Sequence, residues 1–408
     1  MKKILVKGPA ASMSGYGEHT RLILNALRED NDTDLYLMNI KWGQTGNLTK
    51  DTEEKRWIEK LMLKTNEYFQ NNKEAIQSNT PIFDISVQVT IPNEWEKIAK
   101  RNIGITAGIE VDRITHQWIE KSQLVDKIIV PSHFAKQGFD KTVYEMINNK
   151  TGEKVEVRCQ KDVEVIPYPV KDLSVSSTFD KNFFDKIKTQ KNFLAIAQWS
   201  PRKDLETSIR GFLEEFHDEE VGLIIKTNIT NNSVIDRNLA KEKLDNLISE
   251  FPSRKCTVYL LHGNLDRTEM NSLYTNEKVL ALVSTTHGEG YGLPLFEAAY
   301  NGLPVIAPRW SGHVDFLSMS HSGKEKYCAL APKYSLAKVA PEVVWDGVIK
   351  DDSQWCYVDK DSYKESLRKV LSSNYGAYKK RSKKLSENIR NTHSKENVYK
   401  KIIASIKQ

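Results

Sequence analysis

Short apolar segments alternate with longer amphipathic segments along most of this 408-residue sequence. The short runs suit buried strands, and the charged, periodic stretches between them suit helices that cover a sheet. Repeats of strand, helix and strand form parallel sheets, so the sequence predicts an α/β fold. The predicted strands are residues 4–6, 35–38, 83–89, 103–106, 127–130 and 163–166 in the first half, and 193–197, 222–226, 257–261, 279–283 and 304–307 in the second.

The amphipathic segments predict the helices. Residues 52–72 are a charged helical insertion, and residues 362–407 have room for two or three surface helices. The polar stretch 148–159 indicates an exposed hairpin or loop. The other predicted helices are residues 18–27, 114–122, 133–147, 205–216, 236–250, 266–273 and 294–300.

The length of the chain favours two domains of about 150 to 200 residues each over a single hydrophobic core. Pro167-Tyr168-Pro169, followed by the polar segment 171–192, is the best linker candidate. We therefore predict an N-terminal domain of residues 1–172 and a C-terminal domain of residues 173–393.

The composition of the chain gives weaker indications of its partners and its location than the strand and helix pattern gives of its fold. The net charge of +6 permits an anionic partner without requiring one. The four cysteines, at positions 159, 256, 328 and 356, form no C-x-x-C pair, so reduced thiols in a cytoplasm are the expectation. No apolar run approaches the length of a membrane span, and the first residues suit a buried strand better than a signal peptide. We expect a cytoplasmic protein without a transmembrane segment.

The loop after the predicted strand 279–283 has the sequence HGEGYGLPLFE, residues 287–297. Its glycines let the backbone approach a ligand, and Pro294 suits the first position of a helix whose unpaired N–H groups attract an anion. Glu289 in the loop and Glu297 in the first helical turn can accept hydrogen bonds from hydroxyls. This combination of residues indicates a binding site for a sugar attached to a phosphate. The alternative is a tight turn followed by an acidic residue that favours the helix start.

Other loops directly follow predicted strands, which is where open parallel sheets bind ligands. Gly15 and Gly17 open a helix, but without the dinucleotide-binding spacing, so a plain loop is an equal alternative. Arg202 and Lys203 stand beside a helix start, either to neutralise a diphosphate or as solvated surface charges. The remaining candidates after strands include Glu110, Asp112, Asn264 and Leu265, with His19 and Arg21 as weaker candidates beside the two glycines.

The 287–297 loop and its continuation AAYNGLPVIA, residues 298–307, resemble the E-x7-E region of retaining glycosyltransferases of family-4 type, the glycosyl transferases group 1. The resemblance covers most of residues 2–320 and is strongest over 283–316. It implies the GT-B fold, in which two Rossmann-like domains have parallel sheets that face an interdomain cleft. The first domain would take the acceptor and the second the nucleotide-sugar donor, and a C-terminal helix at about 394–408 would pack back on the first.

The resemblance also implies roles. Glu289 and the backbone N–H groups after it would bind the sugar, and Glu297 would bind the ribose hydroxyls. Lys203 and Arg202 would stabilise the departing diphosphate, although the family arginine usually stands near the position of Gln198, so whether Arg202 replaces it stays open. The other implied donor-binding residues are Gly15, Gly17, Asn264, Leu265, Gly290, Tyr291, Gly292 and Leu293.

On the acceptor side, the resemblance implies that Glu110 orients or deprotonates the acceptor hydroxyl. Helix capping by the nearby Asp112 is an equally good explanation of this acidic pair. A D-x-D pair at Asp359 and Asp361 would suit a metal ion, but Ser362 and Glu365 form a capping-box pattern that favours a helix start. We expect no metal and no cofactor, with the nucleotide diphosphate sugar as substrate.

These expectations define a retaining hexosyltransferase. Its acceptor is expected to be a saccharide or a lipid-linked glycan, the commonest acceptors of such enzymes. The positive charge leaves room for a DNA acceptor with a hydroxymethylated base reached by flipping. A nucleotide-sugar-binding protein without catalysis is a third alternative, against which both glutamates and the lysine speak. The length of the chain disfavours a phosphorylase.

Overall fold

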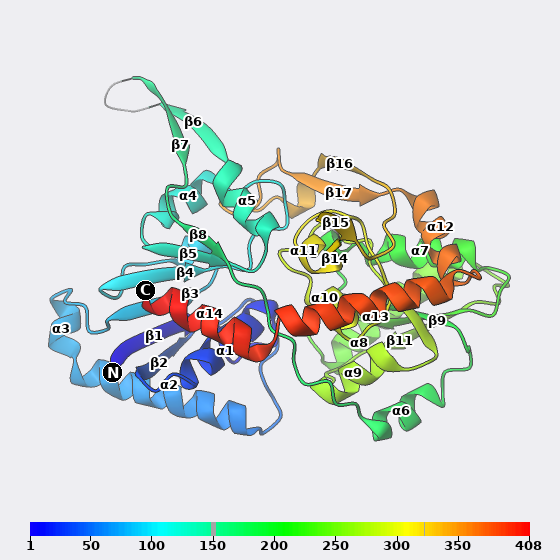
Figure 1. Ribbon diagram of the computed structural model, residues 1–408, viewed down its shortest axis with the longest axis horizontal. Helices are drawn as coiled ribbons and strands as arrows, with labels where there is room; N and C mark the ends of the chain where they lie inside the picture. The colour runs from blue at the N-terminus through cyan, green and yellow to red at the C-terminus, as the bar shows by residue number, and fades with distance from the viewer. Residues whose placement is uncertain (148–151, 322) are drawn as a thin grey trace. The chain divides into compact units, whose positions relative to one another are not determined.

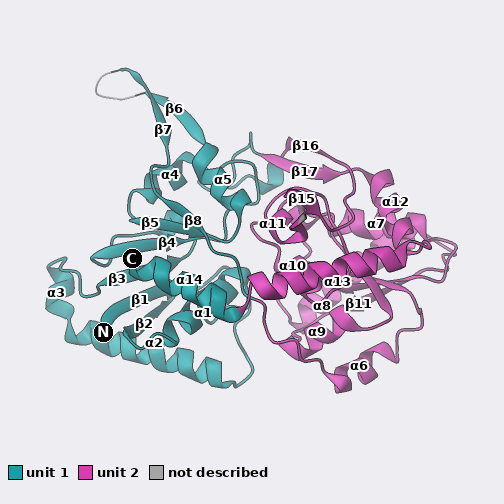
Figure 2. Cartoon of the chain, in the orientation of Figure 1, with its two compact units in different colours: residues 1–169, 340–353, 395–408 teal, residues 170–339, 354–394 magenta. Residues whose placement is uncertain are grey.

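A computed structural model describes residues 1–147, 152–321 and 323–408 of the chain (Figure 1). The chain forms two compact units (Figure 2). Unit 1 comprises residues 1–169, 340–353 and 395–408, and unit 2 comprises residues 170–339 and 354–394. Each unit contains its own parallel sheet.

The sheet of unit 1 has six strands in the order β2-β1-β3-β4-β5-β8, and all neighbours pair in parallel. Helices cover it, so its strands are apolar on both faces, as in Ile4, Leu5 and Val6 of β1. The strands are β1 (Lys2–Gly8), β2 (Thr33–Asn39), β3 (Ile85–Val89), β4 (Arg101–Ile105), β5 (Lys127–Val130) and β8 (Val163–Val165). The helices are α1 (Gly15–Arg28), α2 (Glu53–Asn71), α3 (Lys73–Gln77), α4 (His116–Ser122), α5 (His133–Lys141) and α14 (Lys395–Lys407).

The predicted helix 133–147 is wrong in its second half. Helix α5 ends at Lys141, and the chain continues as β6 (Val143–Ile147), which pairs antiparallel with β7 (Lys154–Arg158). Thr142 is extended at the junction, and the β-branched and aromatic residues after it favour a strand. Residues 148–151 of the predicted hairpin or loop lie outside the described residues.

Two segments from later in the sequence belong to unit 1. Residues 340–353, which the sequence prediction placed in the C-terminal domain, are held by hydrogen bonds from Asn93 Nδ2 and Thr115 Oγ1 to the Gly347 carbonyl, at 3.1 and 2.9 Å. An ion pair of 3.1 Å joins Arg113 to Asp352 in the same segment. Helix α14 packs against α1.

The sheet of unit 2 has five parallel strands in the order β11-β10-β9-β12-β13. The strands are β9 (Asn192–Ile196), β10 (Gly222–Lys226), β11 (Thr257–Leu261), β12 (Val279–Val283) and β13 (Val305–Ile306). The helices are α6 (Ser177–Phe184), α7 (Leu205–Glu215), α8 (Val234–Ser249), α9 (Arg267–Thr275), α10 (Leu293–Tyr300), α11 (Val314–Leu317), α12 (Lys360–Val370) and α13 (Tyr375–Thr392).

Helix α6 lies within the segment predicted to be a linker. Ser176 caps its N-terminus by accepting from Phe179 N, and Phe179, Phe183 and Phe184 contact one another. Phe184 is buried, and α6 packs against α9. The polar residues around these aromatic ones masked a helix that is part of unit 2.

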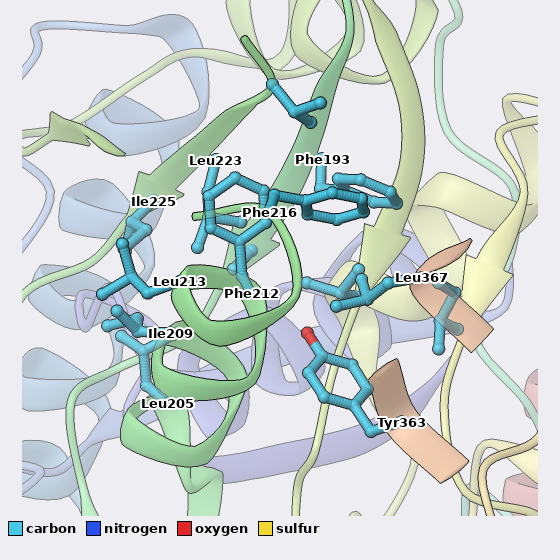
Figure 3. Packing of buried hydrophobic residues seen from close by; sticks show 14 of the residues in the cluster. Phe193, Leu205, Ile209, Phe212, Leu213, Phe216, Leu223, Ile225, Tyr363 and Leu367 are labelled. Carbon is cyan, nitrogen blue, oxygen red and sulfur yellow. The ribbon is translucent and has the colours of Figure 1, made fainter. Parts of the chain in front are cut away.

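The core of unit 2 lies between the sheet and the helices α7 and α12 (Figure 3). Phe193, Phe212 and Phe216 stack or meet edge to face. Tyr363 of α12 is buried against α7 where a Cβ at Gly211 would be only 2.7 Å from its ring. Residues 362–407 therefore contribute to the core and do not form surface helices alone.

Two short antiparallel pairs complete unit 2 and were not predicted. Their strands are β14 (Ser318–His321) with β15 (Lys324–Tyr327), and β16 (Tyr334–Lys338) with β17 (Gln354–Val358). In the described part of the chain, no helix has the length and apolar character needed to cross a membrane.

Candidate active site

The glycine-rich loop joins the carboxyl end of β12 to helix α10. Gly292 has φ of 93°, a left-handed conformation that glycine adopts without strain, and it caps the helix that starts at Leu293. Pro294 is the second helical residue, not the first as predicted. Glu297 therefore lies just past the first helical turn in which the sequence analysis placed it, because the helix starts one residue earlier.

Glu289, Lys203 and Arg202 meet in unit 2. Lys203 Nζ lies 2.6 and 2.8 Å from the two carboxylate oxygens of Glu289. Arg202 Nη1 lies 3.3 Å from Glu289 Oε2 and donates to the Gly288 carbonyl at 2.6 Å. Both cations come from the short 3-10 turn Pro201–Lys203 after β9. Glu289 is only 5 % exposed, so two cations and one carboxylate gather at a nearly closed position.

The electrostatics of Glu289 are dominated by these neighbours. Burial alone would raise the pKa of its carboxyl, but the charges of Lys203 and then Arg202 outweigh burial and lower the pKa to about 2. The carboxylate is therefore ionised at neutral pH. It can accept hydrogen bonds from hydroxyls and can donate none.

Glu289→Gln is expected to be less stable than the wild type at neutral pH and to approach it in acid. The Glu289 pKa falls from its ordinary 4.5 to about 2 on folding, so its contribution is present above pH 4.5 and is lost as pH falls through about 2. A shift of this size corresponds to roughly 3 kcal/mol. The difference between the melting temperatures should narrow as the pH is lowered from 7 to 3, and a gap independent of pH would contradict the assignment.

A second loop braces the Glu289 loop and was missed by the sequence analysis. Ser311 Oγ accepts from Glu289 N at 2.9 Å, and Gly312 N donates to the Glu289 carbonyl at 2.8 Å. A Cβ at Gly312 would lie 2.1 Å from the Gly290 carbonyl oxygen, so only glycine fits there. A Ser-Gly pair just after strand β13 was the available signal. These contacts fix the backbone that carries Glu289.

His287 and Tyr291 hold the loop from its two sides. His287 N donates to the Arg202 carbonyl at 2.8 Å, and His287 Nδ1 lies 2.7 Å from the Cys356 carbonyl in β17. The Tyr291 side chain is buried against Phe296 and Phe316. The Tyr291 ring therefore has a packing role, and its part in donor binding stays a prediction.

Glu297 has partners that the sequence did not indicate. Arg267 Nη1 lies 2.5 Å from Glu297 Oε1, and Tyr274 Oη donates to Glu297 Oε2 at 3.0 Å. The charge of Glu297 also acts on Lys171 and Lys226. Burial, reinforced by Arg267, lowers the pKa of Lys171 to about 7. A partly buried carboxylate, with its side chain 12 % exposed, thus lies beside Arg267 at the position predicted to bind ribose.

Asn264 and Leu265 follow strand β11, as predicted for residues near a base. Asn264 is exposed and accepts a hydrogen bond from Asn232 Nδ2, while Leu265 is half-buried. Lys226 Nζ donates to the carbonyl of Gly263 at 3.3 Å, which ties this loop to the end of β10. Their role in base recognition stays a prediction.

Unit 1 brings together its own predicted residues. Ser14 caps α1 by accepting from Gly17 N at 3.0 Å, and Tyr16 Oη lies 2.7 Å from Thr106 Oγ1. Glu110 is close enough that its charge adds to burial in raising the Tyr16 pKa. The Gly15 loop and the Glu110 segment therefore meet beyond the carboxyl ends of β1 and β4.

His19 and Arg21 are buried residues of helix α1, close to the glycine loop that contains Gly15 and Gly17. Arg21 Nη1 donates to the Ala10 and Ser12 carbonyls, both at 2.7 Å, and Nη2 pairs with Glu18. Burial lowers the pKa of His19 to about 4, so its ring is neutral at physiological pH. The Arg21 side chain therefore holds the glycine loop in shape, while the His19 ring lies beside that of Tyr168, with ring centroids 4.8 Å apart.

Gly17→Ala is expected to destabilise unit 1, whereas Gly15→Ala should be nearly neutral. A Cβ at Gly17 would lie 2.0 Å from the Ser12 carbonyl oxygen, and a Cβ at Gly15 would meet nothing within 4 Å. We expect a loss of about 3 kcal/mol for Gly17→Ala and a change within about 0.5 kcal/mol for Gly15→Ala. Urea denaturation measures both, and equal stabilities would contradict the tight loop.

The D-x-D pair has local partners. Asp359 caps helix α12 by accepting from Ser362 N at 2.8 Å, and Asp361 pairs with Lys364 at 3.0 Å. Asp359 itself is the cap, rather than Ser362 as the sequence pattern suggested. Both carboxylates are accounted for by the start of this helix.

The chain is similar to known proteins both in the sequence of its second unit and in its fold. Residues 177–324, all in unit 2, match the model of the family described as Glycosyl transferases group 1. No curated protein matches the sequence significantly. The fold over the whole chain is similar to that of solved structures. Anabaena HepE in complex with UDP and glucose shares 11 % identity with a TM-score of 0.62, covering 99 % of both chains.

Two more solved structures are similar to the same extent. Sucrose-phosphate synthase from Thermosynechococcus elongatus has 13 % identity and a TM-score of 0.61, covering 99 % of this chain and 98 % of that one. A glycosyltransferase from Rickettsia africae has 12 % identity and a TM-score of 0.61, covering 100 % and 98 %. The chain therefore has the GT-B fold, and residues 177–324 of its second unit are similar to the glycosyl transferases group 1 family.

Proposed function

We propose that this protein transfers a sugar from a nucleotide diphosphate sugar to an acceptor hydroxyl, with the donor bound at the carboxyl edge of the unit 2 sheet. The observation that carries the proposal is the buried Glu289 carboxylate, 2.6 Å from Lys203 Nζ and beside the glycine-rich loop. Lys203 and Arg202 place two cations beside this loop. The diphosphate of a nucleotide sugar is the group that such cations would bind.

The chemistry follows from this charge distribution. As the bond between the sugar C1 and the diphosphate oxygen breaks, negative charge grows on that oxygen, and Lys203 and Arg202 stabilise it. Backbone N–H groups of Gly290 to Leu293, at the start of α10, add hydrogen bonds to the phosphate. The acceptor oxygen forms the new bond to C1, and its proton passes to the leaving diphosphate. The two cations fill the charge-neutralising role, so we propose no cofactor.

Glu289 then binds the sugar and Glu297 the ribose. An ionised Glu289 accepts hydrogen bonds from sugar hydroxyls while it holds Lys203 in place. The resemblance to the family-4 type implies that the sugar is a hexose, that the anomeric configuration is retained and that the acceptor attacks from the face of the leaving group. The similarity to HepE, which was solved with UDP-glucose, supports a sugar-nucleotide donor.

We propose a saccharide or a lipid-linked glycan as the acceptor and a cytoplasmic location, which the four free cysteines support. Glu110, beside Tyr16 in unit 1, is the proposed acceptor-orienting carboxylate. A DNA acceptor would instead require DNA binding that weakens steeply with salt. Tight, salt-sensitive binding to DNA would overturn the saccharide proposal.

Thermal stabilisation by nucleotide sugars tests the donor site. UDP-, GDP-, ADP- and CDP-sugars are added in turn, and one class should raise the melting temperature. Ligand at 100 times its Kd stabilises the folded state by about 2.7 kcal/mol. Stabilisation should be lost in Lys203→Ala and kept in Lys255→Ala, a lysine of unit 2 near the opposite ends of the strands. Failure of every nucleotide sugar, or equal stabilisation of Lys203→Ala, would refute the proposal.

A further inference from the structure

The Glu297 carboxylate is anchored through both oxygens from one face of helix α9. Arg267 and Tyr274 are seven residues apart, so they lie on the same side of that helix. Arg267 Nη1 is 2.5 Å from Oε1, and Tyr274 Oη is 3.0 Å from Oε2. Tyr274 is buried, which restricts its ring, and α9 and α10 are in contact. Two separate donors therefore determine the orientation of the carboxylate plane.

The anchoring leaves acceptor capacity on each oxygen. An ionised carboxylate offers about four lone-pair sites. One site on each oxygen faces Arg267 or Tyr274, so each oxygen retains another for a ligand. Lys226 and, in its protonated form, Lys171 lie within electrostatic reach of the carboxylate. The site can thus receive two hydroxyl donors on neighbouring atoms.

We propose that Arg267 and Tyr274 are positioning residues that fix Glu297 so that its two oxygens recognise the 2′,3′-diol of a ribonucleotide and discriminate against deoxyribonucleotides. The inference rests on the proposed function, because it takes the donor nucleotide as the ligand of Glu297. A ribose presents two vicinal hydroxyl donors to the fixed carboxylate. A 2′-deoxyribose presents one and leaves a desolvated carboxylate oxygen without its partner, which is the costly outcome.

Tyr274→Phe tests this role with little change in shape. Binding of UDP, GDP, ADP and CDP and of their 2′-deoxy counterparts is measured by calorimetry, at the pH where the wild type is most stable. The wild type should bind one ribonucleotide about tenfold more tightly than its deoxy counterpart. In Tyr274→Phe the ribonucleotide should weaken about five- to tenfold and the deoxynucleotide much less, so that the ratio falls towards one.

Tyr375→Phe is the matched control. Tyr375 Oη donates to the Leu280 carbonyl at 3.1 Å in the same unit, in place of the Glu297 carboxylate that Tyr274 contacts. Removing the Tyr375 hydroxyl should leave the ratio of ribonucleotide to deoxynucleotide affinity unchanged, because a purely structural loss affects both ligands equally. Arg267→Lys keeps the charge but loses the planar fork, and we expect an intermediate ratio.

The outcomes separate this inference from the proposed function. If no nucleoside diphosphate binds the wild type, the proposed function fails and this inference with it. If a ribonucleotide binds but Tyr274→Phe and Arg267→Lys retain the wild-type ratio, the positioning role is refuted while the donor site stands. A ratio that falls in Tyr274→Phe and not in Tyr375→Phe supports the role.

Discussion

Glu289→Gln is expected to lower kcat/KM for sugar transfer by about 10²- to 10³-fold. The substitution keeps the shape of the side chain but removes the negative charge that holds Lys203 at 2.6 Å and accepts the sugar hydroxyls. Lys203 would then be free to adopt other rotamers, and the diphosphate would meet a less organised pair of cations. Initial rates measured at saturating acceptor over donor concentrations from below to above KM give kcat/KM and measure the effect.

Glu250→Gln is the control for Glu289→Gln. Glu250 forms an ion pair with Arg210 at 2.5 Å on the exposed surface of the same unit. Losing an exposed pair costs at most about 1 kcal/mol and should leave transfer unchanged. A Glu289→Gln protein that folds normally and transfers sugar at the wild-type rate would remove Glu289 from the site.

Lys203→Ala is expected to affect both stability and transfer. Glu289 is 5 % exposed, and without Lys203 it keeps the more distant Arg202, at 3.3 Å. Removing one partner of a buried pair costs about 3–5 kcal/mol. Transfer should fall by at least about 10²-fold because the leaving diphosphate loses its nearest cation. Urea denaturation and initial rates measure the two effects.

The double variant Lys203→Met/Glu289→Gln distinguishes the two effects. It removes both partners of the ion pair, so no buried carboxylate is left uncompensated. The free energy of unfolding should therefore recover most of what Lys203→Ala loses. Transfer should stay at the level of the single variants. Recovery of transfer along with stability would show that the pair acts only on folding.

The parallel sheets could be predicted closely from the sequence. Their strands are buried on both faces, so they stand out as apolar runs such as Ile4 to Val6 in β1 and Leu223 to Ile225 in β10. Exposed strands have no such signal. The β6 strand was therefore merged into the preceding helix, since Lys141 and Glu145 continue the charged pattern of α5.

The site was predicted only in part. Glu289 and Lys203 could be identified because each follows a strand of one parallel sheet, and the structure brings them together. The partners of Glu297 come from α9 and from the segment before α6, and nothing local in the sequence ties Arg267 or Lys171 to position 297. Such contacts depend on how α9 packs beside α10, which periodicity does not specify.

The boundary of the first unit shows the same limit. Residues 340–353 lie far along the sequence from unit 1, and the carbonyl of Gly347 is the acceptor that ties them to Asn93 and Thr115. Backbone acceptors leave no trace in side-chain patterns. The position of this segment thus had to come from the structure.

Release of nucleoside diphosphate from a nucleotide sugar tests the central claim most directly. Wild-type protein, incubated with the donor that stabilises it and a mixture of saccharide acceptors, should release the nucleoside diphosphate and form a glycosylated product. Glu289→Gln should release it at least about 10²-fold more slowly. Binding of the donor by the wild type without release or product would contradict a glycosyltransferase and indicate a nucleotide-sugar-binding protein.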